Sequence, residues 1–223
     1  MRRGCLITLE GPEGSGKTHL AKRIGERFRE MGLRHSCYRE PGTTDIGLQI
    51  RQVLHDLKNI NMCARTELLL YLASRAQLVE EKIKPALLQG EIVLLDRYGD
   101  SSRVYQGIAR GLGLDRVTQL NDFATEGLRP DLTILIDVDT EVGLERKKYQ
   151  GEWNRLDGEQ VEFHRKVRAG YLSLSQESGR KWVIVKNDST LEVLESRVWG
   201  EVSSFLAGRG FIELEHSRPE RRG

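Results

Sequence analysis

The stretch that decides the fold reads "EGPEGSGKT", residues Glu10 to Thr18, and it directly follows the apolar run at residues 6–9. It contains the pattern Gly-x4-Gly-Lys-Thr between a predicted strand and a predicted helix, which is the context of a phosphate-binding loop, or P-loop. Glycines let backbone N–H groups approach phosphate oxygens, and the helix N-terminus adds a favourable dipole. Lys17 supplies a positive charge, and the hydroxyl of Thr18 suits Mg²⁺. The loop therefore predicts a site for the phosphates of a nucleoside triphosphate.

The composition is that of an ordinary soluble enzyme. The chain has 223 residues, of which 38% are hydrophobic and 30% charged, with a net charge of +2. This length suits one α/β domain with a real core, and no apolar stretch is long enough to span a membrane. Basic residues are scattered, so the pattern disfavours nucleic acid as a partner and favours small anionic ligands.

The cysteines and the N-terminus bear on location. Cys5, Cys37 and Cys63 have neither the spacing of a metal site nor the even number of a disulfide framework. The N-terminus has no charged-then-apolar export signal. A reduced cytoplasm is therefore the expected location.

Five short apolar runs predict strands of a parallel sheet. Such runs are typical of strands that helices cover on both faces. The predicted strands are Cys5–Glu10, His35–Arg39, Ile92–Asp96, Leu132–Val138 and Trp182–Val185. Helical segments alternate with them, so the predicted fold class is α/β: a P-loop, doubly wound, five-stranded parallel sheet with helices on both faces.

Two predicted helices are especially clear. The first follows the P-loop, and its helically spaced apolar residues and terminal glycine are Leu20, Ile24, Phe28 and Gly32. The second runs from Thr66 to about Gln89 and ends at Gly90, and Pro85 is expected to kink its last turn. We expect one domain over residues 1–212 and a polar tail over residues 213–223.

A Mg²⁺ site beside this loop needs a carboxylate, normally an Asp at the end of a buried strand. Asp96 and Asp137 both end predicted strands, and the pattern alone does not decide between them. Asp96 is favoured because Arg97 follows it and would place a guanidinium beside the metal at the carboxyl edge of the sheet. Asp137 is more simply interpreted as a residue that caps the next helix. The predicted metal ligands are therefore Thr18 and Asp96.

The P-loop does not identify the phosphoryl acceptor, because GTPases, ATPases and small-molecule kinases share it. A GTPase would be expected to carry an Asn-Lys-x-Asp segment that reads the base. Here Lys186-Asn187-Asp188 is only a loose match in a late loop, and whether Asn187 reads an adenine stays open. The sequence therefore disfavours a hydrolysing switch protein.

Four stretches in order resemble the thymidylate kinase family, which moves the γ-phosphoryl of ATP onto dTMP. They are "EGPEGSGKT", "REPGTT" at Arg39–Thr44, "TELLLYLASRAQ" at Thr66–Gln77 and "DRYGDSSRVYQG" at Asp96–Gly107. The later "PDLTILIDV" and "FHRKVRAGYLSL" also fit, so the resemblance extends from about Leu6 to Phe205. It implies a nucleoside monophosphate kinase domain with a mobile lid at about residues 145–160, Mg²⁺ with ATP as phosphoryl donor, and a homodimer.

The resemblance also implies a role for each matching position. The expected ATP-binding residues are Gly11, Pro12, Glu13, Gly14, Ser15, Gly16, Lys17 and Thr18. The expected dTMP-binding residues are Glu13, Arg39, Arg51, Tyr71, Arg75, Arg97, Ser102, Tyr105 and Gln106. The expected catalytic residues are Glu13, Lys17, Asp96, Arg97, Arg146 and Arg155.

Within the dTMP set, three arginines, Arg39, Arg51 and Arg97, match positions around the acceptor phosphate. Tyr71 matches the aromatic residue that stacks on thymine. Arg75, four residues later on the same helical face, matches the donor to a thymine carbonyl. Plainer interpretations are a core tyrosine, a surface Arg51, and a solvated Arg75 that pairs with Glu81 or another carboxylate.

The remaining matches concern the sugar, the base edge and the reacting groups. Ser102 and Gln106 match contacts to the base edge, and Tyr105 matches the residue that crowds the 2′ carbon and disfavours ribose. Glu13 matches a loop carboxylate near the metal and the acceptor's sugar. Asp96 matches the acid that serves Mg²⁺ and orients the reacting groups.

The P-loop has no arginine to stabilise the transferring phosphoryl group. In the bacterial type of the family that arginine comes from the lid, which the segment "ERKKYQGEWNRLDGEQ", Glu145–Gln160, resembles. Arg146 and Arg155 are both candidates, and a solvated helix end is the plainer alternative. The usual Asp-Arg-Phe-Glu of the lid reads Asn154-Arg155-Leu156-Asp157 here, and Gly42-Thr43-Thr44 replaces the usual Gly-Gly-Thr.

The predicted activity is ATP-dependent phosphorylation of dTMP to dTDP, as in dTTP synthesis. One alternative is a related P-loop kinase with another pyrimidine monophosphate, such as dUMP, as acceptor. The other is a nucleotide-binding module without catalysis, which retention of Glu13, Lys17, Asp96 and Arg97 disfavours. The expected partners are ATP and dTMP, with neither nucleic acid nor a membrane.

Overall fold

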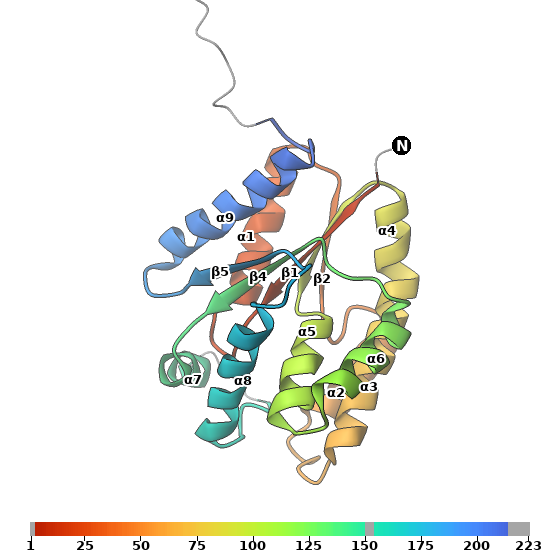
Figure 1. The fold of residues 1–223 in the computed structure, drawn as a ribbon, viewed down its shortest axis with the longest axis vertical. Helices are drawn as coiled ribbons and strands as arrows, with labels where there is room; N and C mark the ends of the chain where they lie inside the picture. Colours follow the sequence, from red (N-terminus) through yellow and green to blue (C-terminus); the bar gives the residue numbers. More distant parts are fainter. Residues whose placement is uncertain (1–2, 150–153, 214–223) are drawn as a thin grey trace, which may run out of the picture.

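A five-stranded parallel sheet forms the centre of the computed structural model, which describes residues 3–149 and 154–213. The strand order is β2-β3-β1-β4-β5 (Figure 1). The strands are β1 (Cys5–Glu10), β2 (His35–Arg39), β3 (Ile92–Asp96), β4 (Leu132–Asp137) and β5 (Trp182–Lys186). The five predicted strands and the α/β class are confirmed, and only the ends of β4 and β5 differ from the prediction by one residue.

Helices lie on both faces of this sheet (Figure 1). The α-helices are α1 (Lys17–Glu30), α2 (Asp45–His55), α3 (Ala64–Leu78), α4 (Lys84–Leu88), α5 (Gly99–Ser102), α6 (Leu114–Thr125), α7 (Thr140–Tyr149), α8 (Val161–Leu174) and α9 (Leu191–Gly208). Two π-helical segments, η1 (Val79–Ile83) and η2 (Arg103–Ala109), continue α3 and α5. None of the described helices combines the length and apolar character that crossing a membrane requires.

The alternation of side chains along β1 explains the two layers. Ile7 and Leu9 point to one face, where they pack in a cluster with α1 and α9, whereas Leu6 packs on the other face with η1 and α4. Every residue of β1, β3 and β4 is buried. A fully buried leucine or isoleucine contributes about 1.5 to 3 kcal/mol, so both layers hold the sheet.

The two clear helices both form, and only the second departs from the prediction. The first begins at Lys17, and Gly32 adopts a φ of 67°, as its predicted terminal position requires. The second begins at Ala64, two residues before the predicted start, and continues through Pro85 to Leu88. Proline lacks the N–H of a regular helical turn, and the disturbance expected at Pro85 is found one turn earlier, as the π-helical η1.

The parallel register brings three strand ends to one edge of the sheet. Arg39 pairs with Asp96, and Asp96 pairs with Leu9, the residue before Glu10. The P-loop leaves β1 at this same edge. The sheet therefore places a guanidinium, a carboxylate and the phosphate-binding loop beside one another. The boundary at residue 212 stays a prediction, and the predicted tail lies outside the described residues except for Glu213.

Candidate active site

The P-loop glycines occupy positions that other residues cannot. Gly11, Gly14 and Gly16 have φ values of 148°, 66° and 90°. A Cβ on Gly14 would lie 1.9 Å from the carbonyl oxygen of Gly143, and one on Gly11 would lie 2.4 Å from that of Ile136. The backbone of the loop therefore packs directly against the backbone of α7 and β4. The first turn of α1 faces the space on the other side of the loop.

Lys17 is held inside this loop. Its ammonium donates to the carbonyl oxygen of Pro12 at 2.8 Å and to Oγ of Ser15 at 2.9 Å. Burial, followed by the nearby charge of Arg97, lowers the pKa of Lys17 to about 7 even though Glu13 opposes the change. A bound polyphosphate would favour the charged form again, because an opposite charge at close range stabilises an ammonium.

The predicted metal ligands lie in direct contact. The hydroxyl of Thr18 donates to Oδ2 of Asp96 at 2.6 Å. A hydroxyl and a carboxylate are hard oxygen ligands of the kind that Mg²⁺ takes together with nucleotide phosphates and water. Among the described residues no group of three or more His, Cys, Asp or Glu side chains is placed to hold a metal by itself. The donor set thus fits an ion that arrives with a triphosphate.

Asp137, the competing strand-end carboxylate, lies in a different environment. Arg168 donates to both of its oxygens, at 2.7 and 3.1 Å. The expectation that Asp137 caps the following helix is wrong, because it is Asp139 that accepts from the backbone N–H of Glu141, at 3.2 Å. Arg168 reaches Asp137 from α8, a pairing over 31 positions that the local pattern does not reveal.

Arg97, Glu13 and Tyr105 form a linked group at the mouth of the P-loop. Arg97 donates to Oε2 of Glu13 at 2.7 Å, and the hydroxyl of Tyr105 donates to the same oxygen. Burial alone would raise the pKa of Glu13, but the charges of Arg97 and Lys17 and the Tyr105 hydroxyl outweigh it and lower that pKa to about 2. Glu13 is therefore a carboxylate at neutral pH.

The side chain of Arg97 is held in place by residues that were not identified from the sequence. Its backbone has a φ of 72°, which is uncommon for a side-chain-bearing residue. Its guanidinium donates to Oγ of Ser101 at 3.3 Å and to Oη of Tyr171 at 3.2 Å. Both hydroxyls in turn donate to Oε2 of Glu10, at 2.7 and 2.8 Å. This network holds the guanidinium in one orientation.

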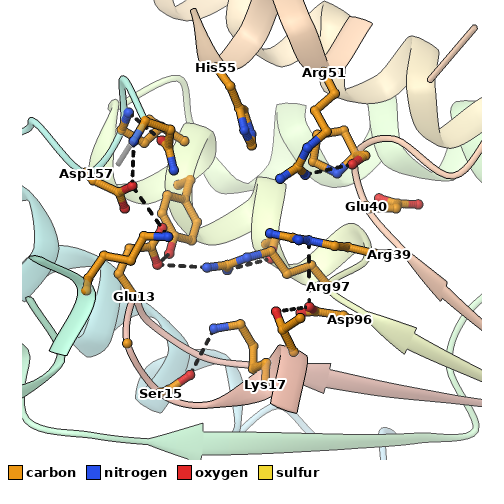
Figure 2. Close-up of a pocket in the computed structure, with 18 of the residues that line it drawn as sticks. Glu13, Ser15, Lys17, Arg39, Glu40, Arg51, His55, Asp96, Arg97 and Asp157 are labelled. Carbon is orange, nitrogen blue, oxygen red and sulfur yellow. Dashed lines mark hydrogen bonds and ion pairs between the residues drawn. The ribbon is translucent and has the colours of Figure 1, made fainter. Parts of the chain in front are cut away.

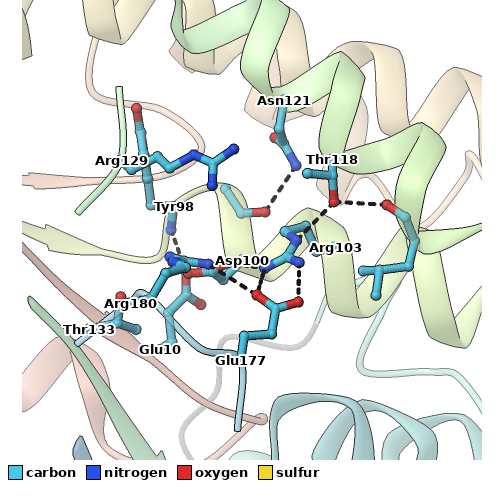
Figure 3. Close-up of polar contacts among 12 residues, drawn as sticks. Glu10, Tyr98, Asp100, Arg103, Thr118, Asn121, Arg129, Thr133, Glu177 and Arg180 are labelled. Atoms are coloured by element: carbon cyan, nitrogen blue, oxygen red, sulfur yellow. Dashed lines mark hydrogen bonds and ion pairs between the residues drawn. The ribbon is translucent and has the colours of Figure 1, made fainter. Parts of the chain in front are cut away.

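Glu10 and Asp100 anchor the segment that follows Arg97 (Figure 3). Glu10 is fully buried and accepts from the backbone N–H of Tyr98 at 2.8 Å, and burial, helped by the charge of Asp100, raises its pKa. Asp100 is held by both terminal nitrogens of Arg180, at 2.6 and 2.5 Å, and by Arg103 at 3.1 Å. Glu10 lies inside the quoted P-loop stretch, which is the signal that could have suggested it.

One cavity of about 380 Å³ joins these groups to α2 and α3 (Figure 2). Glu13 to Thr18 of the P-loop line it, and Asp96 lines it as well. Eight of the nine residues expected to bind dTMP also line it, with Arg75 as the exception. The cavity is therefore large enough and polar enough for small charged ligands, and it spans the two groups of predicted residues.

Tyr71 and Arg75 differ in their relation to this cavity. Tyr71 lines it, whereas Arg75 is only 1% exposed and lies behind Ser102 and Glu40, which line it. Arg75 donates to Glu40 at 2.7 Å, to Ser102 at 2.9 Å, and also to Asn121 and the carbonyl oxygen of Tyr98. Arg75 thus pairs with a carboxylate other than Glu81, as one alternative allowed, but the expectation that this pair is solvated is wrong because both side chains are buried. Four of its five N–H groups are used within the protein, and a contact with the base stays a prediction.

The two lid arginines do not line the cavity. Arg155 is 7% exposed and donates to Glu67 at 2.5 Å and to the carbonyl oxygen of Leu54 at 3.2 Å. Arg146 lies on α7, and the nearest basic lid residue that lines the cavity is Lys147. Residues 150–153 of the lid lie outside the described residues. Which lid arginine acts stays open.

Glu67 links the lid to the acceptor side. It is fully buried, and besides Arg155 it accepts from Arg110 and, at 2.8 Å, from Nε2 of Gln106. Gln106 therefore keeps its amide oxygen for another partner. Sequence reasoning missed Glu67, because its partners come from two segments far from it in the chain, residues 106–110 and Arg155. It also missed several lining residues, namely His19, Glu40, Pro41, His55, Ser101, Lys147, Asn154, Leu156 and Asp157.

Known proteins are similar to this chain in sequence and in fold. A family model described as thymidylate kinase matches residues 9–198. The chain is 44% identical over 208 residues to the thymidylate kinase of Clostridium novyi (strain NT), which covers 92% of this chain and 100% of that protein. It also superposes on the solved structure of thymidylate kinase from Ehrlichia chaffeensis with a TM-score of 0.74 at 28% identity, covering 90% of this chain and 99% of that one.

Proposed function

The chain belongs to the thymidylate kinase family, and from that premise we propose that it transfers the γ-phosphoryl group of ATP to dTMP, giving dTDP and ADP. The observation that carries the proposal is the single cavity lined both by the P-loop and by eight of the nine residues expected to bind dTMP. Donor and acceptor phosphates would meet at the carboxyl edge of the sheet, which is where open α/β sheets bind ligands.

On the donor side, the backbone N–H groups at the start of α1 would hold the ATP phosphates. Lys17 would leave Pro12 and Ser15 to contact the phosphates at the reacting end, since its present partners are only a carbonyl and a hydroxyl. Thr18 and Asp96 would hold Mg²⁺, which when bound neutralises charge between the phosphates. The hydroxyl-to-carboxylate contact at 2.6 Å supports this assignment.

On the acceptor side, Arg39, Arg51 and Arg97 would surround the phosphate of dTMP. All three line the cavity, and Arg51 is oriented by a hydrogen bond to the carbonyl oxygen of Pro41 at 2.9 Å. Tyr71 would stack on thymine, and Tyr105, held by Glu13, would crowd the 2′ position of the sugar. Catalysis would then consist of positioning and charge neutralisation for an in-line transfer, without a covalent enzyme intermediate.

Assembly and location belong to the same proposal. Family membership supports a homodimer in the cytoplasm, and the free thiols of Cys37 and Cys63, both exposed, suit a reduced compartment. Ile46 and Leu48 on α2 and Leu69 on α3 are about half exposed, at 51%, 47% and 58%, and offer apolar area for a second copy. Light scattering on the purified protein checks this, and a mass of one chain would contradict the dimer.

A rate measurement tests the activity. ADP release is measured with ATP and Mg²⁺ alone, and then with dTMP, dUMP, UMP or CMP added. We expect ADP only when an acceptor is present, dTDP as the product, and the highest initial rate with dTMP. A faster rate with dUMP or CMP would assign another acceptor. A dTMP-induced rise in melting temperature without any ADP release would indicate a binding module without catalysis.

The matched control for this assay is a pair of lysine variants. Lys17→Ala removes the P-loop ammonium, whereas Lys22→Ala removes an exposed lysine from the same helix. ADP release that is lost in the first variant and kept in the second comes from this site. Equal release in both would trace the activity to a contaminant.

A further inference from the structure

His55 is a residue of the cavity that neither the P-loop pattern nor the family resemblance pointed to. It is the last residue of α2 and lines the cavity one helical turn after Arg51. Figure 2 shows both side chains pointing into the cavity from α2, opposite Lys17. Among the described residues, no hydrogen-bond partner is found for either nitrogen of the His55 ring. An unpaired, half-buried imidazole directed at a cavity is available to a ligand.

The charges that face His55 are mostly positive. They come from four elements of the structure: Arg51 on its own helix, Arg39 at the end of β2, Arg97 after β3 and Lys147 on α7. Burial, followed by these four charges, lowers the pKa of His55 to about 3. The ring is therefore neutral in the unliganded protein at physiological pH.

Each of the acids that share the cavity has a partner other than His55, although Oε1 of Glu40 and Oδ1 of Asp157 accept no hydrogen bond from the described residues. Glu13 is held by Arg97, and Asp157 accepts from the backbone N–H of Asn154 at 2.8 Å and faces Lys147 at 3.7 Å. Asp96 accepts from Thr18, and Glu40 is paired with Arg75 at 2.7 Å. None of them is hydrogen-bonded to the His55 ring. An anionic ligand is therefore the group that would change its charge state.

A phosphate dianion bound between these cations would reverse the electrostatic effect on His55 and favour the protonated ring. Three of the four cations that face His55 are the arginines expected to surround the acceptor phosphate. An opposite charge within about 6 Å favours the protonated form of a base. The carbonyl groups at the C-terminus of α2 favour the protonated ring as well, because they carry partial negative charge.

We propose that His55 is a further substrate-binding residue, neutral without ligand, that takes up a proton from solvent when the acceptor phosphate binds and then donates from its ring to a phosphate oxygen. This rests on the proposed function, since it assumes that a phosphate acceptor enters this cavity. A permanently charged residue at position 55 would repel the four neighbouring cations before the ligand binds. A histidine adds its charge only when the dianion is present.

The test is a pH titration of the histidine ring signals by nuclear magnetic resonance with carbon-13-labelled full-length protein. The His55 signal is assigned by its loss in His55→Gln, and His35, whose ring bonds the carbonyl oxygen of Leu33 outside the cavity, serves as reference. The arms are free protein, thymidine, ATP and dTMP. We expect His55 to stay neutral at pH 6 in the free, thymidine and ATP arms and to be at least half protonated there with dTMP, which from a pKa of about 3 requires its proton affinity to rise about a thousandfold or more.

Each other outcome has a defined meaning. Bound dTMP with an unchanged His55 titration would overturn the inference and leave the proposed function intact. An equal change with thymidine would overturn it too, because thymidine has no phosphate. A change with ATP alone would assign the contact to the donor and overturn the acceptor assignment. Failure of both thymidine and dTMP to bind would overturn the proposed function itself.

Kinetics give a second readout. His55→Gln should raise KM for dTMP by about threefold to tenfold, the effect of one charge-assisted hydrogen bond, with a smaller change in kcat and none in KM for ATP. Gln52→Ala, at an exposed position of the same helix, should leave all three values unchanged. An equal rise of both KM values in His55→Gln would indicate general damage to the site and overturn the inference.

Discussion

The arginines at the two ends of the cavity differ in their exposure and in their partners. At the phosphate end, the side chains of Arg97 and Arg39 are 21% and 40% exposed and line the cavity. At the end near α3, Arg75 is 1% exposed and its guanidinium is taken up by protein acceptors. At the phosphate end the guanidinium groups therefore remain accessible to an anionic ligand. At the other end the buried guanidinium of Arg75 is part of the rigid wall of the cavity.

This difference predicts which property each residue controls. A guanidinium that faces the cavity can contact a ligand as well as its protein partners, so its removal should reduce binding or catalysis in addition to any loss of stability. A buried guanidinium that satisfies a buried carboxylate is part of the framework, so its removal should reduce stability as well.

Arg75→Ala should have the largest effect on folding. It leaves Glu40 buried at 4% exposure without its cation, and breaking a buried pair in this way costs about 4 kcal/mol. Urea unfolding measures the loss. In the folded fraction, affinity for dTMP should fall far more than affinity for ATP. Equal losses for both nucleotides would contradict the base-side position of Arg75, and Arg75→Lys supplies a variant that keeps the charge if the alanine variant fails to fold.

Lys17→Ala should have the largest effect on catalysis. Removing one preorganised charge donor from a reacting centre costs about 3 kcal/mol or more of transition-state stabilisation, roughly a hundredfold or more in kcat/KM. Its free energy of unfolding should change little, because Lys17 bonds only a carbonyl and a hydroxyl in the folded chain. Near-normal turnover in this variant, measured by coupled ADP release, would rule out the proposed mechanism.

The depressed pKa of Glu13 predicts a dependence of stability on pH. The folded value of about 2 lies below the ordinary 4.5, so the carboxylate stabilises the folded state above pH 4.5 and loses this effect as pH falls toward 2. The contribution is about 3 kcal/mol. Unfolding at pH 3 and pH 6 should therefore differ less in Glu13→Gln than in the unmodified protein. An identical pH dependence would show that Glu13 is not held as a carboxylate by Arg97.

Tyr171→Phe should have the smallest effect of the set. It deletes a hydroxyl that accepts from Arg97 and donates to Glu10, and one such hydrogen bond is worth about 1 kcal/mol. We expect about a fivefold rise in KM for dTMP from the looser Arg97. Tyr98→Phe is the matched control, since its hydroxyl donates to the carbonyl oxygen of Leu128 at 3.2 Å and does not bond Arg97. Equal effects of the two variants would remove the positioning role of Tyr171.

The sequence predicted the phosphate end better than the rest of the site. The P-loop, the strand before it and the first helix are contiguous, so local pattern and chemistry were sufficient. Asp96 and Asp137 could not be separated by pattern, because the difference lies in Thr18 and Arg168, which reach them over 78 and 31 positions. The π-helical η2, which carries Tyr105 and Gln106, also has no signal in hydrophobic periodicity.

The lid shows the same limit. Arg155 matched a family position by spacing, but spacing does not reveal that a fully buried Glu67 accepts from it over 88 positions. His55 was missed because in the sequence it resembles an ordinary polar residue at the end of a helix. The charges that face it come from four separate elements. Residues whose properties depend on such long-range charges become visible only in three dimensions.

The central claim is that one acceptor spans both ends of the cavity, with thymine near Tyr71 and phosphate at Arg97. Calorimetric binding of dTMP and thymidine to Arg97→Ala and Arg75→Ala tests it most directly. Arg97→Ala should weaken dTMP at least about tenfold and leave thymidine within about twofold, since a guanidinium bonds phosphate strongly, whereas Arg75→Ala should weaken both ligands. Equal weakening of dTMP and thymidine by Arg97→Ala, or unchanged thymidine binding in Arg75→Ala, would contradict the claim.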